Sequence, residues 1–184
     1  GLRSEFFERR VLTTLALFRA VQDNYAEYAG VDADSGLSYY RGVDVESQGF
    51  ELEASGRITE EWHLLAGYTD LDLEDRNGDD ARTFIPRRTV NLTTRYAPQA
   101  LPGLQLGLAV KWQDEIHLDA AAGEIRQDAR DVWTMFASYA FADRYEISVQ
   151  ADNLTDEKYL TSLYWDQSFY APPRNYTASF RVDF

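Results

Sequence analysis

Residue types that commonly perform catalysis or bind metals are few in this chain and stand far apart. There is no cysteine, which excludes disulfides and thiolate metal ligands. The only two histidines, His63 and His117, lack the spacing of a metal-binding pair. No G-x-S-x-G or other nucleophile signature accompanies the scattered serines. The sequence therefore predicts a protein that is not an enzyme and that binds no metal ion directly.

An acidic run surrounds Asn77 and Gly78. Its spacing does not follow the calcium-binding loop pattern. Runs of like charge are usually solvated, so we expect the tip of a solvent-exposed hairpin here. The carboxylates concerned are Asp70, Asp72, Glu74, Asp75, Asp79 and Asp80.

Two long polar segments carry aromatic side chains. Aromatic rings in long exposed loops are candidate contacts for an amphipathic ligand, and packing of one loop on another is the alternative explanation. We expect Asn153, Tyr159 and Arg174–Asn175 to be structural instead, fixing the entry to the last strand. The candidate ligand-binding residues are Tyr39, Tyr40 and Arg41 in segment Asn24–Asp44, and Tyr164, Trp165, Phe169 and Tyr170 in segment Leu154–Arg174.

The composition limits the partners and the way in which the chain could cross a membrane. A net charge of −13 argues against nucleic-acid binding, which needs a basic face. No window approaches the roughly 20 apolar residues of a transmembrane helix. A spanning β-strand needs only about 9–11 residues, of which every second one is apolar, so a membrane remains compatible with this sequence.

Strict alternation of apolar and polar residues runs through most of the chain and is clearest at its end. From Tyr176 to Phe184 every second residue is apolar, as in a strand with one apolar and one polar face. Only Val11–Asp23 is apolar on both sides, so its faces stay unassigned. Turn signals divide the chain into about nine antiparallel strands. The expected strands are Leu2–Phe7, Val11–Asp23, Gly49–Ile58, Trp62–Tyr68, Val90–Tyr96, Leu104–Gln113, Trp133–Phe141, Tyr145–Asp152 and Tyr176–Phe184.

The predicted connections alternate in length, and aromatic residues gather at both ends of the apolar faces. Short turns on one rim and long loops on the other are typical of bacterial outer-membrane barrels, with the long loops outside the cell. Aromatic belts at two heights are typical of the same proteins. The short-turn belt comprises Trp62, Tyr96, Phe141, Tyr145 and Phe184, and the long-loop belt comprises Tyr68, Trp112, Trp133 and Tyr176.

These patterns predict an all-β fold, an antiparallel transmembrane β-barrel. The alternative is a soluble β-sandwich with its aromatic residues in a dry core, which would not explain aromatic residues at both ends of the apolar faces. Several charges fall on the inward faces and need a wet lumen or a polar plug, because an unpaired buried charge is costly. These charges are Glu51, Glu53, Arg57, Arg95, Lys111, Glu146, Asp152, Arg181 and Asp183.

Nearly the whole chain resembles TonB-dependent outer-membrane receptors, in particular the ferric-siderophore group. The resemblance rests on the order and spacing of several short motifs, each of them weak alone. They are Phe18-Arg19 with Gln22-Asp23-Asn24, the run Ser47–Glu53, Gly67-Tyr68-Thr69 before Pro86-Arg87, Asn153-Leu154 with Asp156 and Tyr159, Pro173-Arg174-Asn175, and the terminal Phe184.

The resemblance implies that residues 1–184 form the C-terminal part of a 22-stranded barrel, with the N-terminal plug domain outside this sequence. It further implies uptake of a ferric siderophore, contact with outer-membrane lipid, energy from the TonB complex through the missing N-terminal region, and insertion by the barrel-assembly machinery through the last strand. Iron is then expected only as a ferric-siderophore chelate. A small porin-like or autotransporter-type barrel without a high-affinity ligand is the alternative, and a secreted soluble β protein is a third.

Overall fold

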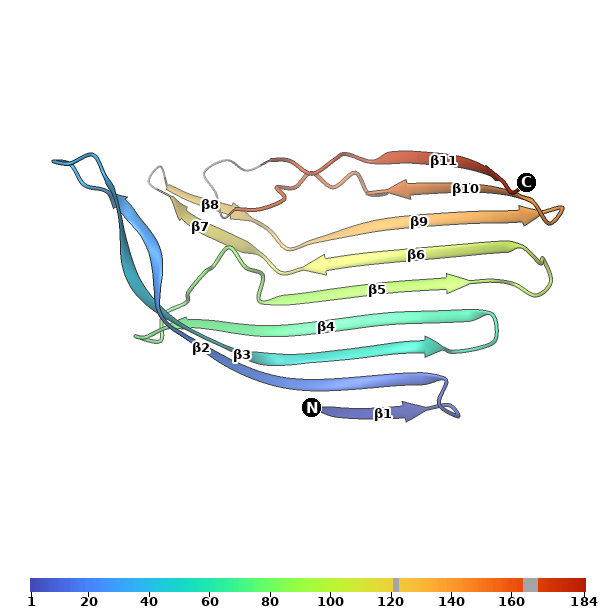
Figure 1. Ribbon diagram of the computed structural model, residues 1–184, viewed down its shortest axis with the longest axis horizontal. Helices are drawn as coiled ribbons and strands as arrows, with labels where there is room; N and C mark the ends of the chain where they lie inside the picture. Colours follow the sequence, from blue (N-terminus) through green and yellow to red (C-terminus); the bar gives the residue numbers. More distant parts are fainter. Residues whose placement is uncertain (121–122, 164–168) are drawn as a thin grey trace.

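The protein is built from β-strands arranged mainly in one open sheet (Figure 1). The computed structural model describes residues 1–120, 123–163 and 169–184. Within this part of the chain, no helix is long and apolar enough to cross a membrane. The strands are β1 (Leu2–Phe6), β2 (Val11–Val31), β3 (Ser38–Arg57), β4 (Trp62–Asp75), β5 (Arg88–Tyr96), β6 (Leu104–Gln113), β7 (Ile116–Ala120), β8 (Gly123–Gln127), β9 (Arg130–Phe141), β10 (Tyr145–Asp152) and β11 (Asn175–Val182).

The sheet is antiparallel, and its nine strands follow the order β1-β2-β3-β4-β5-β6-β9-β10-β11. Each strand therefore pairs with its neighbour along the chain, except that β6 pairs with β9 across a separate two-stranded hairpin, β7–β8. Neither β1 nor β11 has a second partner among the described residues, so the sheet is an open piece of wall. The predicted antiparallel all-β architecture is confirmed.

Pairing keeps the apolar residues of successive strands on one face of the sheet. Leu52 lies opposite Tyr68, and Tyr68 lies opposite Val90. At the other end of the sheet, Ile147 lies opposite both Tyr139 and Phe180. Because side chains at paired positions point to the same side, these alignments produce one continuous apolar face, and the opposite face is the polar face.

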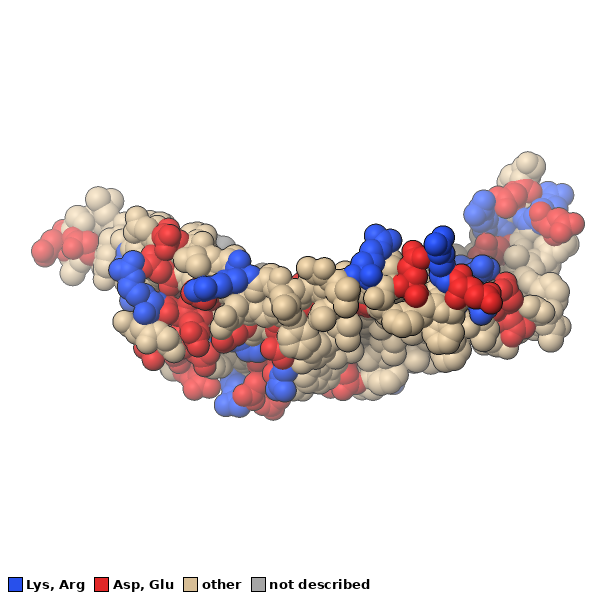
Figure 2. All heavy atoms as spheres, turned by 90° about the horizontal axis from the view of Figure 1, so that it is seen from below, with Lys and Arg blue, Asp and Glu red and all other residues tan. Residues whose placement is uncertain are grey.

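The sandwich alternative is wrong, because the apolar face is not covered. Phe180 is 60% exposed, Ile147 47% and Leu106 41%, where a sandwich would bury all three. Leaving a continuous apolar sheet face in water is unfavourable, so this face requires an apolar environment outside the chain. Figure 2 shows the curved edge of the sheet, with charged side chains gathered mainly over the end that carries the β2–β3 hairpin and again toward the opposite end.

The register also assigns the faces of β2, which the sequence pattern left open. Leu15 lies opposite Leu52 and Leu17 opposite Phe50, so these two leucines belong to the apolar face. Phe18 points to the polar face, where its ring lies over Gly49: a Cβ on that glycine would be 2.9 Å from the ring. The second apolar series of β2 therefore has a local packing partner, which explains why the pattern was ambiguous.

Three of the predicted long connections were wrong in detail, because strands continue into them. Residues 24–31 and 38–44 of the expected polar loop belong to β2 and β3, and the turn between them covers only residues 32–37. The strand β4 likewise continues to Asp75, and the loop between β6 and β9 contains the β7–β8 hairpin. In β4 the alternation continues, but its sides are exchanged: after Tyr68 the charged residues stand on the side that is apolar nearer the short turns, and Leu73 on the other side is buried at 4% exposure, so the acidic run was taken for a loop.

The long-loop end is held together by contacts between separate loops. Thr83 donates its hydroxyl to the carbonyl of His117 at 2.8 Å, and the His117 amide donates to the Thr83 carbonyl at 3.1 Å. Ile116 beside them is buried, at 5% exposure. On the other side of the β7–β8 hairpin, the Leu160 amide donates to Gln127 Oε1 at 2.7 Å. The hairpin thus joins the connection before β5 to the loop before β11.

Gly107 provides a sharp test of the polar-face packing. A Cβ at this position would lie 1.8 Å from Cε1 of Phe136, so the ring fills the place of the missing side chain. We expect Gly107→Ala in the full-length protein to lower the free energy of unfolding by about 1–3 kcal/mol through overpacking. Gly67→Ala is the matched control, because nothing lies within 4 Å of a Cβ there. Urea unfolding in detergent would measure both, and equal stabilities would contradict the packing.

The contact between Arg88, at the start of β5, and Asp114, just after β6, should weaken in acid. Arg88 donates its Nε–H to Asp114 Oδ2 at 2.7 Å, and this hydrogen bond lowers the pKa of Asp114 below its ordinary value. Its contribution to stability is therefore present above the unfolded-chain pKa of about 3.9 and is lost as pH falls through the lower folded pKa. We expect amide exchange at Asp114 and Glu115 to accelerate in that acid window in the wild type. In Asp114→Asn the exchange should already be faster at neutral pH and should change little with acid.

Candidate functional site

The short-turn aromatic belt is assembled from neighbouring strands. Trp62 lies directly opposite Tyr96, and Phe141 lies opposite Tyr145. The rings of Phe141 and Tyr145 stack with centroids 5.5 Å apart, and Tyr145 stacks on Phe180 at 5.9 Å. Phe184 lies two residues beyond β11 and is fully exposed. The predicted belt residues within the strands therefore share the apolar face.

The long-loop belt lies at the other end of the same face. Tyr68 and Trp112 are both opposite Val90. Trp133 lies opposite Val110, which is two residues nearer the short turns than Trp112 on the same strand. Tyr176, on β11, is 73% exposed.

Both belts drift toward the short-turn end as they cross the sheet. Through the pairing of successive strands, Trp62 and Tyr96 align with Ala137 of β9. The belt residue on β9 is instead Phe141, four positions nearer the short turns. A level belt must drift in this way when strands are tilted, as barrel strands are, by roughly 35–45°.

Beyond the long-loop belt, the apolar face changes abruptly to charged residues. Asp70, two positions after Tyr68, lies opposite Arg88. Gln48 donates to Asp72 at 3.3 Å, and Arg19 pairs with Glu46 at 2.5 Å. The same face of the sheet is apolar nearer the short turns. The first charged positions therefore mark the height at which this face is no longer in an apolar environment.

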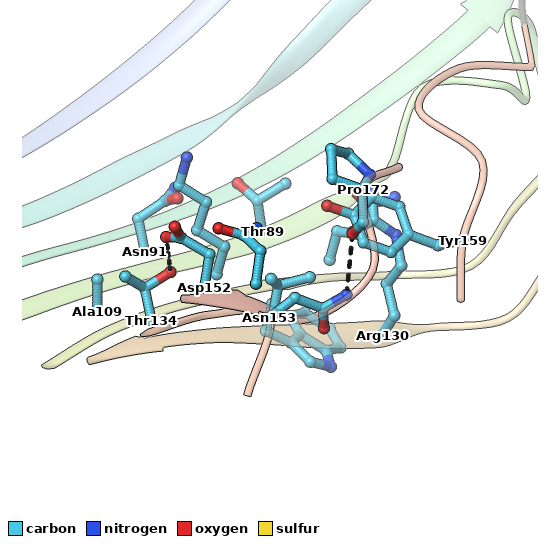
Figure 3. Close-up of a pocket in the computed structure, with 14 residues that line it drawn as sticks. Thr89, Asn91, Ala109, Arg130, Thr134, Asp152, Asn153, Tyr159 and Pro172 are labelled. Atoms are coloured by element: carbon cyan, nitrogen blue, oxygen red, sulfur yellow. Dashed lines mark hydrogen bonds between the residues drawn. The ribbon is translucent and has the colours of Figure 1, made fainter. Parts of the chain in front are cut away.

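The polar face carries a cavity of about 560 Å³ beside the last loop (Figure 3). Small side chains such as Ala109 form its floor, and the segments around Tyr159 and Pro172 form its wall on the loop side. The side chains that line it are Thr89, Asn91, Ala109, Lys111, Trp112, Gln113, Arg130, Val132, Thr134, Asp152, Asn153, Tyr159, Pro172 and Asn175.

Asn153 anchors the loop beside this cavity and is 4% exposed. Its Nδ2 donates to the carbonyls of Glu157 at 2.9 Å and Pro172 at 3.3 Å, and its Oδ1 accepts from the Glu157 amide at 2.8 Å. One amide thus ties the start of the loop to its end. The backbone of Asn153 has a φ of 51°, which asparagine tolerates better than most residues. This geometry agrees with the structural role expected for Asn153.

Arg130 holds the same loop from the strand side. Its guanidinium lies over the ring of Tyr159, 3.6 Å from the centroid, and its Nη2 donates to Gln113 Oε1 at 2.9 Å. Arg174 completes the entry to β11, since its backbone amide donates to Asp156 at 2.8 Å. Sequence reasoning missed Arg130, although its position at the start of a strand next to a long loop was visible.

The first group of candidate ligand-binding residues lies on β3 and not in a loop. Arg41 pairs with Glu27 across the hairpin at 3.3 Å. Tyr40 meets Tyr28 edge to face with centroids 6.0 Å apart. Tyr39 points to the other side of β3, where its ring lies beside Gly30, whose Cβ would be 3.2 Å away. The two tyrosines are 51% and 62% exposed, so both keep surface available.

The second group lies on the loop before β11. Phe169 is 70% exposed and Tyr170 is 61% exposed, with the Lys158 ammonium 4.5 Å from the Tyr170 centroid. Tyr164 and Trp165 lie outside the described residues. The two groups thus belong to separate projections, the β2–β3 hairpin and the last loop, at the same end of the sheet (Figure 1).

Metal-binding side chains do not cluster in the part of the chain that the structure describes. Among the described residues, no group of three or more His, Cys, Asp or Glu side chains could hold a metal ion. The polar-face cavity, by contrast, offers amides, hydroxyls, two cations and a carboxylate, which suit a polar organic ligand. Sequence reasoning missed this cavity as a site.

The Asn153 network predicts the behaviour of the last loop. We expect Asn153→Asp to place carboxylate lone pairs against the carbonyls of Glu157 and Pro172, at a cost of about 1–3 kcal/mol for lost donors. Limited proteolysis of the full-length protein should then cut within 154–173 faster than in the wild type. Asn175→Asp is the control, because among the described residues that exposed amide donates only to Pro173, at 3.4 Å. Equal cleavage in both variants would contradict the anchoring role.

Comparison with known proteins gives a consistent result. The family described as "TonB dependent receptor-like, beta-barrel" matches residues 1–154. The chain is 28% identical to the ferripyoverdine receptor of Pseudomonas aeruginosa, over 100% of this chain and 24% of that receptor. It is 30% identical to the ferric-pyoverdine 358 receptor of Pseudomonas putida, over 100% of this chain and 23% of that protein.

A solved structure agrees with these relatives. The crystal structure of the outer-membrane ferripyoverdine receptor of Pseudomonas aeruginosa bound to ferripyoverdine matches with a TM-score of 0.84 and 28% identity, over 99% of this chain and 26% of that chain. The chain thus spans about a quarter of the length of the curated relatives it matches. With its two-faced antiparallel sheet and the match over residues 1–154, this chain belongs to the TonB-dependent receptor β-barrel family of the bacterial outer membrane.

Proposed function

We propose that this chain is part of an outer-membrane receptor that takes up a ferric siderophore by TonB-dependent active transport. The observation that carries the proposal is the full-length similarity of the chain, in sequence and in fold, to ferripyoverdine receptors. Residues 1–184 would form the C-terminal portion of the barrel wall. The plug domain and the contact with the TonB complex would belong to the remainder of the receptor.

The seating of the wall in the membrane follows from the apolar face. The two aromatic belts would lie at the two lipid–water interfaces, and the charged positions beyond Tyr68 would stand outside the lipid. The short turns would then face the periplasm, and the β2–β3 hairpin would project from the cell. The last strand, β11, offers a free edge through which the barrel-assembly machinery would act.

The ligand would meet the aromatic residues of the two projections first. Tyr39 and Tyr40 on the hairpin, with Phe169 and Tyr170 on the last loop, offer exposed rings to an amphipathic chelate. The chelator would supply the iron ligands, so iron would arrive as a complete ferric-siderophore complex. Arg41 is paired with Glu27, and its role would be to orient the hairpin surface.

Iron uptake by cells provides the test. We expect cells that lack the complete gene to lose uptake of radioactive iron supplied as ferripyoverdine, and to recover it when the gene is restored. Uptake should stop when an uncoupler collapses the proton gradient, because active transport through this family depends on that gradient. Ferripyoverdine is the probe because relatives are named as its receptors.

A porin-like barrel would behave differently in the same experiment. Purified receptor in liposomes should leave small sugars excluded, whereas an open pore would produce swelling. Passive uptake that persists with the uncoupler, together with liposome swelling, would reject the receptor function. Binding of ferripyoverdine without swelling would support it.

A further inference from the structure

The polar-face cavity contains more hydrogen-bond donors than its own side chains use. This feature lies on the inner wall, away from the exposed aromatic residues of the two projections. An inference drawn from it rests on the proposed function, because it concerns the ligand of the same receptor. The chain carries a net charge of −13, so a donor-rich, cationic spot on it is a local exception.

Lys111 is the first unused donor. It lies on β6 directly opposite Asn91, and both side chains line the cavity. Within the described part of the chain, no hydrogen bond or ion pair engages the Lys111 ammonium or the Asn91 amide. An ammonium and an amide side by side offer up to five N–H donors to one ligand group.

Arg130 adds a second cation. Its Nε is buried and has no hydrogen-bond partner among the described residues, although Nη2 is bonded to Gln113. The ring of Tyr159 covers the guanidinium, so this nitrogen is closed to a ligand, and Arg130 contributes its positive charge to the loop side of the cavity. Thr89, on β5 opposite Gln113, also lines the cavity and contributes a hydroxyl.

The one carboxylate in the cavity does not balance these cations. Asp152 accepts from the Thr134 hydroxyl at 3.2 Å and from the Gln150 amide at 2.9 and 3.0 Å. No ion pair joins Asp152 to Lys111 in the described structure. The carboxylate is therefore used to order β10 against β9, and the cations remain available to a ligand.

We propose that this cavity is a subsite for an oxyanion group of the incoming chelate, such as a carboxylate. Lys111 and Asn91 would bind the oxyanion, with Thr89 two positions from Asn91 on β5 and the positive charge of Arg130 at the loop side. Charge-assisted hydrogen bonds of this kind are the strong ones. The volume of about 560 Å³ lies within the ~300–1,000 Å³ range of small-molecule sites. The subsite would bind the chelate after it has left the exposed rings.

Lysine acylation tests the cavity without a siderophore. Lys111 and Lys158 are the only lysines of this chain, and Lys158 lies on the last loop. In the full-length receptor, we expect sodium sulfate to slow acylation of Lys111 by at least several-fold relative to sodium chloride at equal ionic strength. Lys158 should be unaffected. Equal acylation of Lys111 in the two salts would overturn the proposal.

The same experiment distinguishes the chelate from the protein's own acidic groups. Lys111 could instead resist acylation in chloride both in receptor saturated with ferripyoverdine and in receptor freed of it. In that case a carboxylate of the receptor itself occupies the cavity. That result would also overturn the proposal. Free reactivity in chloride that falls with added ferripyoverdine would support it.

Affinity measurements on variants provide the second arm. We expect Lys111→Gln to weaken ferripyoverdine binding by about tenfold, the effect of one charge-assisted hydrogen bond. Lys111→Arg should restore most of the affinity, and Lys158→Gln should bind as the wild type does. Wild-type affinity in Lys111→Gln would overturn the proposal.

The two proposals can fail separately. If the wild-type receptor does not bind ferripyoverdine, the proposed function fails for this chelate, and the sulfate experiment still decides the subsite. If the wild type binds ferripyoverdine and neither sulfate nor Lys111→Gln has an effect, the subsite is rejected while the function stands.

Discussion

The structure depends on the register of its antiparallel ladder. Side chains alternate along each strand, so a slip of one residue between two strands would move the apolar side chains of one strand to the polar face. The ladder avoids this slip across all nine strands, as the pairing of Tyr68 with Leu52 and Val90 shows. A wall with an apolar side and a polar side is the result, and it positions the belts, the charged margin and the cavity.

A second set of interactions closes the long-loop end of the wall. Asn153 joins the start of the last loop to its end, and Arg130 holds that loop through the ring of Tyr159. Gln127 extends the connection to the β7–β8 hairpin. These contacts link segments far apart in the sequence. They give the cavity on the polar face a fixed wall on the loop side, whereas the exposed rings of Phe169 and Tyr170 remain outside.

The sequence was sufficient for the parts of the fold that follow from alternation. The strand from Tyr176 onward was recognisable, because each of its faces meets a uniform environment. The extension of β4 to Asp75 was not, because beyond Tyr68 the charged residues take the side that was apolar before, and the acidic run was therefore taken for a loop. The cavity could not be predicted either: it requires β6 to pair with β9, which places Lys111 beside Val132, and no local pattern encodes that pairing. The ligand roles of Tyr39, Tyr40 and Arg41 stay predictions.

The β2–β3 hairpin contains two irregularities, between Gln22 and Tyr25 and between Tyr28 and Gly30, each of which adds one residue to β2. The last residue pair between β3 and β4 toward the tip of the hairpin is Val45 with Asp75. Both irregularities lie beyond this pair. Extra residues are therefore absorbed where only two strands meet. Insertions or deletions in this arm should be tolerated without any change below, so its length and tip can diverge between related proteins while the embedded wall keeps its geometry.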